Sequence, residues 1–456
     1  MSDAVTDSTA SATILADPGS TAASRAKLVV FLSIVVFVLE GTDAQLLAFA
    51  APVLIKEWGL KQVDLAPALA AASGGMVLGS MLGGILGDIL GRRRVMLTSL
   101  AGFGALTVLS GAVHDLDQMT ILRALGGVGF GAIFPNIFAL VSEVAPIERR
   151  ARYVTIATLG VPLGSMVGAL GAGSAMPVTG WRVCFYGAGI ATLAASAALA
   201  AKLPESPAFE ERRAAKREGA AVEPGRAGGW SATHPWVKGA SSLCMIVQAG
   251  LRRRTLGLWL LAFSLGYVTY AFVHWGPTML TMSGISLRLA IMSTFFLSLF
   301  MAIAPFAMAW ALGRWGSRTS MLVAILIYMF ATFAFGGVLN DLLGLPASLR
   351  IPAVMAALSV IGFAVGATTS CLYALSAHSY PIACRATGAG FSIAIGRLGQ
   401  MATAFGSAIV LGEVTGGTTG VVVAAIVGLA VAGISTIVID THIPAFEIVE
   451  FPGSIR

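Results

Sequence analysis

Two acidic residues, Glu40 and Asp43, lie inside a predominantly apolar run that extends from Leu28 to Ile55. Their spacing puts both carboxyl groups on one face of a helix. Burial and a like-charged neighbour both favour the neutral, protonated form of a carboxyl group. The pair can therefore bind a proton near neutral pH and release it to a more alkaline compartment, which predicts a proton-coupling site. A structural ion pair with a buried arginine is the alternative.

Two arginines, Arg123 and Arg397, also fall inside apolar runs, one in each half of the chain. A guanidinium group binds a carboxylate through two parallel hydrogen bonds. We therefore predict that these arginines are ligands of an anionic substrate held between the halves. The alternative is that they pair internally with Glu143 or Asp43.

An aromatic stripe lies in the stretch FSLGYVTYAFVHWGPTML, where Phe263, Tyr267, Tyr270 and His274 recur at the spacing of one helix face. Tyrosine rings stack on aromatic ligands, and tyrosine hydroxyl and imidazole groups bond polar substituents. We predict that Tyr267, Tyr270 and His274 contact a substrate. Packing against neighbouring helices is the alternative.

The elements that must position these groups are membrane helices. Of 456 residues, 57% are hydrophobic and 11% are charged, whereas soluble proteins carry about 25% charged residues. Apolar runs of roughly 18 residues or more recur, each long enough to cross a hydrocarbon layer of about 30 Å. A spanning backbone must satisfy its own hydrogen bonds, which favours helices. The expected spans are 28–55, 66–89, 95–113, 118–142, 153–174, 181–201, 255–280, 288–312, 319–340, 351–376, 386–411 and 417–439.

These spans predict an all-α membrane protein with twelve transmembrane helices in two six-helix bundles. Residues 27–201 and 255–440 are the expected bundles, and 202–254 is a polar central loop. Residues 1–26 form a tail that lacks the basic start and apolar core of a signal peptide, and 441–456 form a second tail. The four cysteines show no metal-binding spacing.

Basic residues gather on one side of the expected helices. With a cytoplasmic N-terminus, most of the 29 lysines and arginines fall in the tails, the central loop and the other loops of that side. The basic residues expected outside are Lys56, Lys61, Arg182, Arg288 and Arg350. This asymmetry follows the positive-inside rule, so it predicts that both tails and the central loop are cytoplasmic. The formal net charge of +7 then reflects orientation in a lipid bilayer, and no nucleic-acid partner is expected.

Two short matches relate the halves. GGILGDILGRRR after the second span matches AWALGRWGSR after the eighth, which aligns Gly91 with Gly316. APIERRAR after the fourth span matches YPIACRATG after the tenth, which aligns Arg150 with Arg385. Matches at equivalent points indicate a parallel internal repeat.

This organisation resembles the major facilitator superfamily. The loop after the second span fits its signature G-x-x-x-D-x-x-G-R-[RK] at Gly84, Asp88, Gly91, Arg92 and Arg93, and LPESPAF after the sixth span resembles a further signature. The resemblance implies two bundles that rock around a central cavity. The glycines allow close helix approach and a tight turn, while Asp88 can cap a helix or pair with an arginine as a gating latch. A simple topology determinant is the alternative.

The acid pair narrows the resemblance. EGTDAQLLAFAAPVL is similar to the first-helix signature D-G-x-D of the aromatic acid/proton symporter family, with Glu40 in place of the first Asp. RALGGVGFGAIFPN and YPIACRATGAGFSIAIGRLGQ resemble the same family. The positions that the resemblance associates with transport are Glu40, Asp43, Asp88, Arg123, Glu143, Arg385 and Arg397. We assign gating to the signature loop together with Glu143 and Arg385. Because Glu40 moves the charge by one methylene, coupling can survive while the substrate fit changes.

The expected function is proton-coupled import of a small aromatic carboxylate, of the hydroxybenzoate type, by alternating access in an inner membrane. We expect a monomer that uses the proton gradient and has no cofactor or metal. The sequence has no nucleophile–base pair or nucleotide motif, and its central loop is too short for a catalytic domain, which argues against an enzyme or sensor. A carrier or exporter of another solute, such as a sugar, an aliphatic carboxylate or a drug, is the alternative.

Overall fold

The structure is a computed structural model, and it describes residues 18–145, 150–206, 209–211, 213–214, 248–380, 385–412 and 417–445. The described residues form helices and contain no strand, which confirms the predicted all-α class. The helices of the first half are α1 (Pro18–Glu57), α2 (Gln62–Leu90), α3 (Arg92–Ser110), α4 (Leu116–Val144), α5 (Arg150–Thr158), α6 (Gly160–Thr179) and α7 (Trp181–Lys202). Those of the second half are α10 (Ala249–Met282), α11 (Leu287–Leu339), α12 (Ala347–Ser379), α13 (Arg385–Gly412) and α14 (Gly417–Val438).

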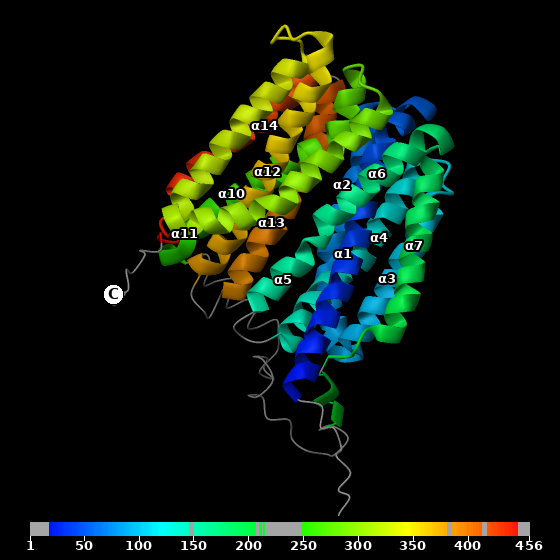
Figure 1. Ribbon diagram of the computed structural model, residues 1–456, viewed down its shortest axis with the longest axis vertical. Helices are drawn as coiled ribbons and strands as arrows, with labels where there is room; N and C mark the ends of the chain where they lie inside the picture. Colours follow the sequence, from blue (N-terminus) through cyan, green and yellow to red (C-terminus); the bar gives the residue numbers. More distant parts are fainter. Residues whose placement is uncertain are drawn as a thin grey trace, which may run out of the picture.

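The predicted spans correspond to these helices with two adjustments. Helix α11 has 53 residues, and Gly316 within it adopts φ 72° and ψ 171°, so the chain changes direction there between the eighth and ninth spans (Figure 1). The fifth span is divided between α5 and α6 at Leu159. In the described chain, ten helical stretches are long and apolar enough to cross a membrane, with α11 counted as one and α3 not among them.

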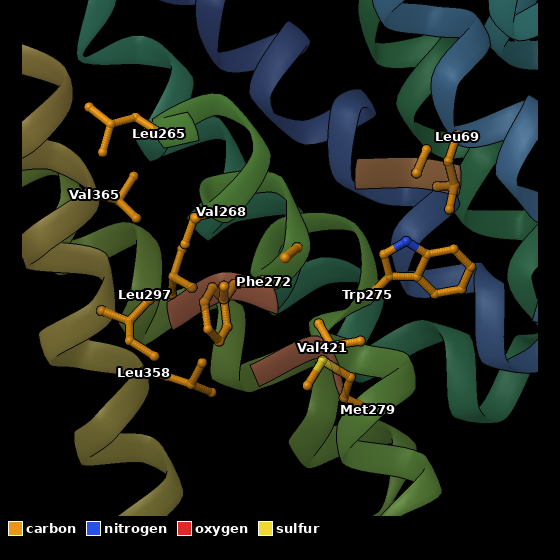
Figure 2. Close-up of a cluster of buried hydrophobic side chains, with 14 of the residues drawn as sticks. Leu69, Leu265, Val268, Phe272, Trp275, Met279, Leu297, Leu358, Val365 and Val421 are labelled. Carbon is orange, nitrogen blue, oxygen red and sulfur yellow. The ribbon is translucent and has the colours of Figure 1, made fainter. Parts of the chain in front are cut away.

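The helices form two bundles that lie side by side, α1–α7 in one and α10–α14 in the other (Figure 1). The bundles meet where α6 contacts α11, α2 contacts α13 and α1 contacts α10. Figure 2 shows apolar side chains gathered around α10, among them Val268, Phe272 and Trp275, together with Leu69 from α2 of the other half. Large apolar side chains such as Phe330, 74% exposed, cover the outer surface, where hydrocarbon rather than water surrounds a membrane protein.

Glycines bring α2 and α4 into backbone contact. A Cβ atom on Gly75 would lie 2.1 Å from the carbonyl oxygen of Ala124, and one on Gly79 would lie 2.1 Å from that of Val128. Gly83 and Gly87 continue the series one turn at a time, so they form one small-residue face of α2. Gly84, which the signature singles out, is rotated off this face, and its nearest neighbour would be Pro135 Cβ at 4.0 Å.

The contacts that join the halves run from the middle of the helices towards one end. We call the end at residues 91, 145, 203, 316, 380 and 440 the tail side, and the opposite end the far side. Near the far side, Gln62 Nε2 lies 3.9 Å from Met282 Sδ, and α6 meets α11 around Gly173. At the tail side, the described ion pairs each join groups of a single half, such as Arg254 with Asp440. Among the described residues, these side-chain contacts between the halves therefore lie in the middle of the helices and towards the far side.

Candidate functional site

Asp43 and Arg123 form a buried ion pair inside the first half. Arg123 Nη1 donates to Asp43 Oδ2 over 2.8 Å, and the two side chains are 4% and 7% exposed. Thr107 Oγ1 on α3 donates to Asp43 Oδ1 over 2.8 Å, and Arg123 Nη2 donates to Ser110 Oγ over 3.0 Å. The guanidinium carbon also lies 5.3 Å from the ring centre of Phe185. Of the two alternatives for Arg123, internal pairing with Asp43 is the arrangement adopted here.

Glu40, one helical turn before Asp43, is buried without such a partner. Its side chain is 8% exposed, and no described group forms a hydrogen bond with Oε2. Its charged neighbours are Arg397, from the second half, and Asp43. Burying a carboxylate oxygen without a hydrogen bond costs free energy. Binding of a proton to this oxygen, or a hydrogen bond donated to it by a ligand, is therefore favoured.

Gly41 sets the orientation of the acids on α1. A Cβ atom there would lie 2.0 Å from the carbonyl oxygen of Val161, so only glycine lets α1 pack this closely on α6. Ser165 Oγ donates to the Gly41 carbonyl oxygen over 3.2 Å at the same contact. The side of α1 that carries Gly41 is therefore packed against α6. Glu40, the preceding residue, has Arg397 of the other half among its neighbours.

Arg397 on α13 joins the two halves at the level of Glu40. Its Nη1 donates to Gln400 Oε1 over 3.2 Å, and the same oxygen accepts from Ser73 Oγ on α2 over 3.3 Å. The guanidinium carbon lies 5.9 Å from the ring centre of Phe134 on α4. Arg397 is partly exposed, and Glu40 is its acidic neighbour. Unlike Arg123, it is therefore available to an incoming anion.

The aromatic stripe on α10 divides into two parts. Tyr270 neighbours Arg397 and Gln400, and its ring meets that of His274 edge-to-face at 4.8 Å between centres. His274 is 6% exposed, and its Nδ1 has no hydrogen-bond partner in the described chain. Tyr267 instead packs against α13, where a Cβ on Gly406 would lie 2.9 Å from its hydroxyl oxygen. Substrate contact stays a prediction for all three, and the geometry favours Tyr270 and His274.

The tail-side signature loop contains a second charge cluster. Arg92 forms an ion pair with Glu143 at the end of α4, and Ser206 Oγ also donates to Glu143. Gly91 adopts φ 100°, the left-handed region that favours glycine, as expected for a tight turn. The backbone N–H of Arg93 donates to Glu205 Oε1 over 3.0 Å. Gating by this cluster stays a prediction. The side chains of Asp88 and Arg385 lie outside the described part of the chain.

The aligned turn in the second half is built in a similar way. Gly316 has φ 72°, and the backbone N–H of Ser317 donates to the carbonyl oxygen of Ile443 over 2.9 Å. The N–H of Ile443 returns a bond of 2.8 Å to Ser317 Oγ. In each half, a residue that follows the last helix accepts a hydrogen bond from the backbone N–H just after the turn. In the first half Glu205, after α7, caps the start of α3. In the second half Ile443, after α14, caps the part of α11 that follows Gly316. This likeness supports the internal repeat.

Several residues of the central site were not predicted from the sequence. Gln400 lies one turn after Arg397 and could have been found by helical spacing, but an uncharged amide in an apolar run is a weak signal. Ser73, Phe134 and Tyr373 carry no local pattern. Tyr373 is known to belong to the site only because it neighbours Arg397 in space.

Two helical bundles with a charged site on their shared boundary are the architecture of a multi-pass membrane transporter. The described residues contain no group of His, Cys, Asp and Glu that could hold a metal ion. The chain belongs to the Major Facilitator Superfamily, whose family model matches residues 33–404. It is accordingly a transporter and not an enzyme.

The sequence is similar to that of characterised bacterial transporters over most of its length. It is 28% identical over 392 residues to a gallate transporter of Pseudomonas putida, covering 84% of each chain. It is 29% identical over 397 residues to the 4-hydroxybenzoate transporter PcaK of the same species, covering 84% of this chain and 86% of that one. It is 29% identical over 422 residues to the 3-(3-hydroxy-phenyl)propionate transporter of Escherichia coli K12, covering 92% and 95%.

Solved structures share the fold at low sequence identity. A D-xylose-proton symporter matches with a TM-score of 0.71 and 15% identity, over 92% of this chain and 98% of that one. The inward-open xylose transporter XylE from E. coli matches with a TM-score of 0.66 and 16% identity, over 89% and 94%. These likenesses confirm the predicted major facilitator fold.

Proposed function

We propose that the protein is a proton-coupled symporter that imports a small aromatic carboxylate of the hydroxybenzoate type by alternating access. The observation that carries the proposal is the position of Arg397 on the boundary between the halves, with Glu40 as its acidic neighbour. Arg397 supplies a cation for a carboxylate, and Glu40 supplies a group that can exchange a proton. Both lie among aromatic side chains.

The site suits a ligand that combines a ring, a carboxylate and a polar substituent. A carboxylate can bind Arg397 through two hydrogen bonds, and its ring can stack near Phe134 and Tyr270. Gln400 and His274 offer hydrogen-bonding groups for a ring hydroxyl. The named substrates of the three relatives each combine these features, which supports the same class here.

Competition for one cation provides the coupling. A charged Glu40 attracts Arg397 and so weakens the binding of a second carboxylate. A proton on Glu40 removes that attraction and leaves the guanidinium to the substrate, so proton and acid bind together. When the proton leaves on the other side, Glu40 recovers its charge and displaces the substrate. Asp43 is the second coupling candidate, but in this conformation Arg123 holds it.

We further propose that the tail side is the cytoplasmic side of the inner membrane, with both termini there. The bias of basic residues towards that side supports this orientation. One chain supplies both halves of the site, which supports function as a monomer.

Uptake of radiolabelled 4-hydroxybenzoate by right-side-out vesicles tests the proposal. We expect accumulation when an inward proton gradient is imposed and its loss when a protonophore collapses that gradient. Cyclohexanecarboxylate, xylose and a cationic dye serve as comparison solutes, and each should be carried poorly. The proposal would be contradicted if uptake of 4-hydroxybenzoate did not depend on the proton gradient, or if one of the comparison solutes were transported faster than 4-hydroxybenzoate.

A further inference from the structure

A cavity lies near the far side, where the two halves meet. Its volume is about 650 Å³, within the range of roughly 300–1,000 Å³ that small-molecule sites occupy. Its walls come mainly from the last turns of α1 and α10, with Gln62 of α2 and Leu287 of α11 completing it. Its lining residues differ from the neighbours of Arg397 described above, which are Glu40, Phe134, Tyr270, Tyr373 and Gln400.

Two charged residues, Lys56 and Glu57, line the cavity, and the lysine has no acidic partner in the described chain. Lys56 lines it and is exposed. Glu57, which also lines the cavity, pairs with residues of α7: Arg182 Nη1 donates to its Oε1 over 2.8 Å, and Trp181 Nε1 donates to its Oε2 over 2.9 Å. No acid of the described chain pairs with Lys56. An ammonium group on a flexible stem at the mouth of a cavity attracts anions.

The cavity also offers a buried hydroxyl group and apolar walls. Thr278 is 2% exposed, and its Oγ1 has no hydrogen-bond partner in the described residues. In the described chain, the hydrogen-bond contact of the Gln62 amide group is a long one, 3.9 Å from Nε2 to Met282 Sδ, so the amide is available to a ligand. Val53 and Met282 supply apolar and polarisable surface. This combination matches an organic anion with a ring and a hydroxyl group.

The same two helices lead from this cavity to the central site. On α10, Tyr270, His274, Thr278 and Thr281 follow one another at spacings of a single helix face. On α1, Lys56 comes sixteen residues after Glu40, a rise of about 24 Å along the axis. The far-side cavity thus lies at one end of a row of polar side chains on α10 whose other end, Tyr270, neighbours Arg397.

We propose that the far-side cavity is a vestibule that captures the aromatic carboxylate before it reaches Arg397. Lys56 binds the carboxylate, and Thr278 and Gln62 receive the ring hydroxyl. The ligand class rests on the function proposed above, while the position and residues of the vestibule are additional to it. The vestibule raises the local concentration of substrate on the side from which it is imported.

Initial rates of 4-hydroxybenzoate uptake in right-side-out vesicles test this proposal with Lys56→Gln. The matched control is Lys61→Gln, which removes the same charge from a residue that does not line the cavity. At low ionic strength we expect Lys56→Gln to raise KM roughly three- to tenfold with Vmax unchanged. The increase should shrink at high salt, which screens exposed charges. Efflux from preloaded vesicles, where substrate binds from the tail side, should keep its wild-type KM.

A second variant separates the hydroxyl group from the charge. Thr278→Val keeps the side-chain shape, and we expect a smaller rise in the KM of uptake without a change in its salt dependence. If Lys56→Gln behaves like Lys61→Gln while the wild type accumulates 4-hydroxybenzoate normally, the vestibule is refuted and the proposed function stands. If the wild type does not accumulate the acid, both proposals fail.

Discussion

Arg123 and Arg397 are both enclosed by membrane helices, but the two halves of the molecule neutralise them differently. In the first half, Asp43, Ser110 and the ring of Phe185 surround Arg123 within a single bundle. In the second half, Arg397 contacts Gln400 and has its acidic neighbour, Glu40, across the boundary. In the proposed mechanism the halves move relative to each other. An ion pair within one bundle then keeps its surroundings, whereas a charge whose counter-charge lies across the boundary does not.

The difference assigns separate roles to two acids that look alike in the sequence. Asp43 has a partner for each carboxylate oxygen, so its charge stabilises the first bundle. Glu40 keeps an oxygen without a hydrogen bond, so its state depends on what occupies the central site. Coupling and stability can therefore be changed separately.

The largest expected effect is loss of stability in Asp43→Asn. This change leaves Arg123 buried and unpaired, and breaking a buried ion pair from one side costs about 3 kcal/mol or more. We expect a clearly lower melting temperature for the purified variant in detergent. The double variant Asp43→Asn/Arg123→Gln removes both charges and should recover part of the loss. If Glu40→Gln lowered the melting temperature by the same amount, Glu40 and Asp43 would both be required for stability, and the contrast between them would be wrong.

The next effect is loss of transport in Arg397→Gln with the fold retained. Charge-assisted hydrogen bonds contribute roughly 1.5–3 kcal/mol each, so Vmax/KM for 4-hydroxybenzoate should fall about 100-fold. Initial uptake rates, corrected for the amount of protein in the membrane, measure this loss. Arg350→Gln, which removes an arginine near the far side, is the control. Near-normal uptake by Arg397→Gln would place the carboxylate elsewhere.

Glu40→Gln should have a smaller and more selective effect. Glutamine mimics the protonated side chain, so exchange of labelled for unlabelled substrate should continue at a rate within about threefold of wild type. Accumulation driven by a pH gradient should be lost, because the position no longer releases a proton. If Glu40→Gln still accumulates substrate and Asp43→Asn is folded but does not, the coupling acid is Asp43.

The smallest effect is expected at the hydrogen bond between the halves. Ser73→Ala removes the donor to Gln400, a neutral bond worth about 1 kcal/mol. The far-side-open state then becomes easier to reach, and the KM of uptake should change by no more than about fivefold. Ser80→Ala, whose hydroxyl bonds within its own helix, is the control. A loss as large as that in Arg397→Gln would mean that the Ser73 hydroxyl, or the position of Gln400 that it fixes, is itself required for substrate binding.

The sequence predicted the helices well because apolar length and backbone self-sufficiency are local properties. It also predicted the turn at Gly91 and the intramembrane charges. It could not decide which arginine joins which acid, because that depends on α1, α3 and α4 meeting in space. Gly84 shows a related limit: the tight face of α2 runs through Gly83 and Gly87, and one residue along a helix is a rotation of about 100°. Pattern alone leaves such a rotation undecided.

During synthesis, the two halves can be completed one after the other. Glu205, which accepts from the Arg93 amide, follows directly after α7 and is made before any residue of α10. The first bundle can therefore cap its signature turn while the second is still being translated. Ser317 must wait for Ile443, after α14 has entered the membrane. Domains generally fold as units from the N-terminus, and each bundle contains within its own sequence the segment that caps its turn.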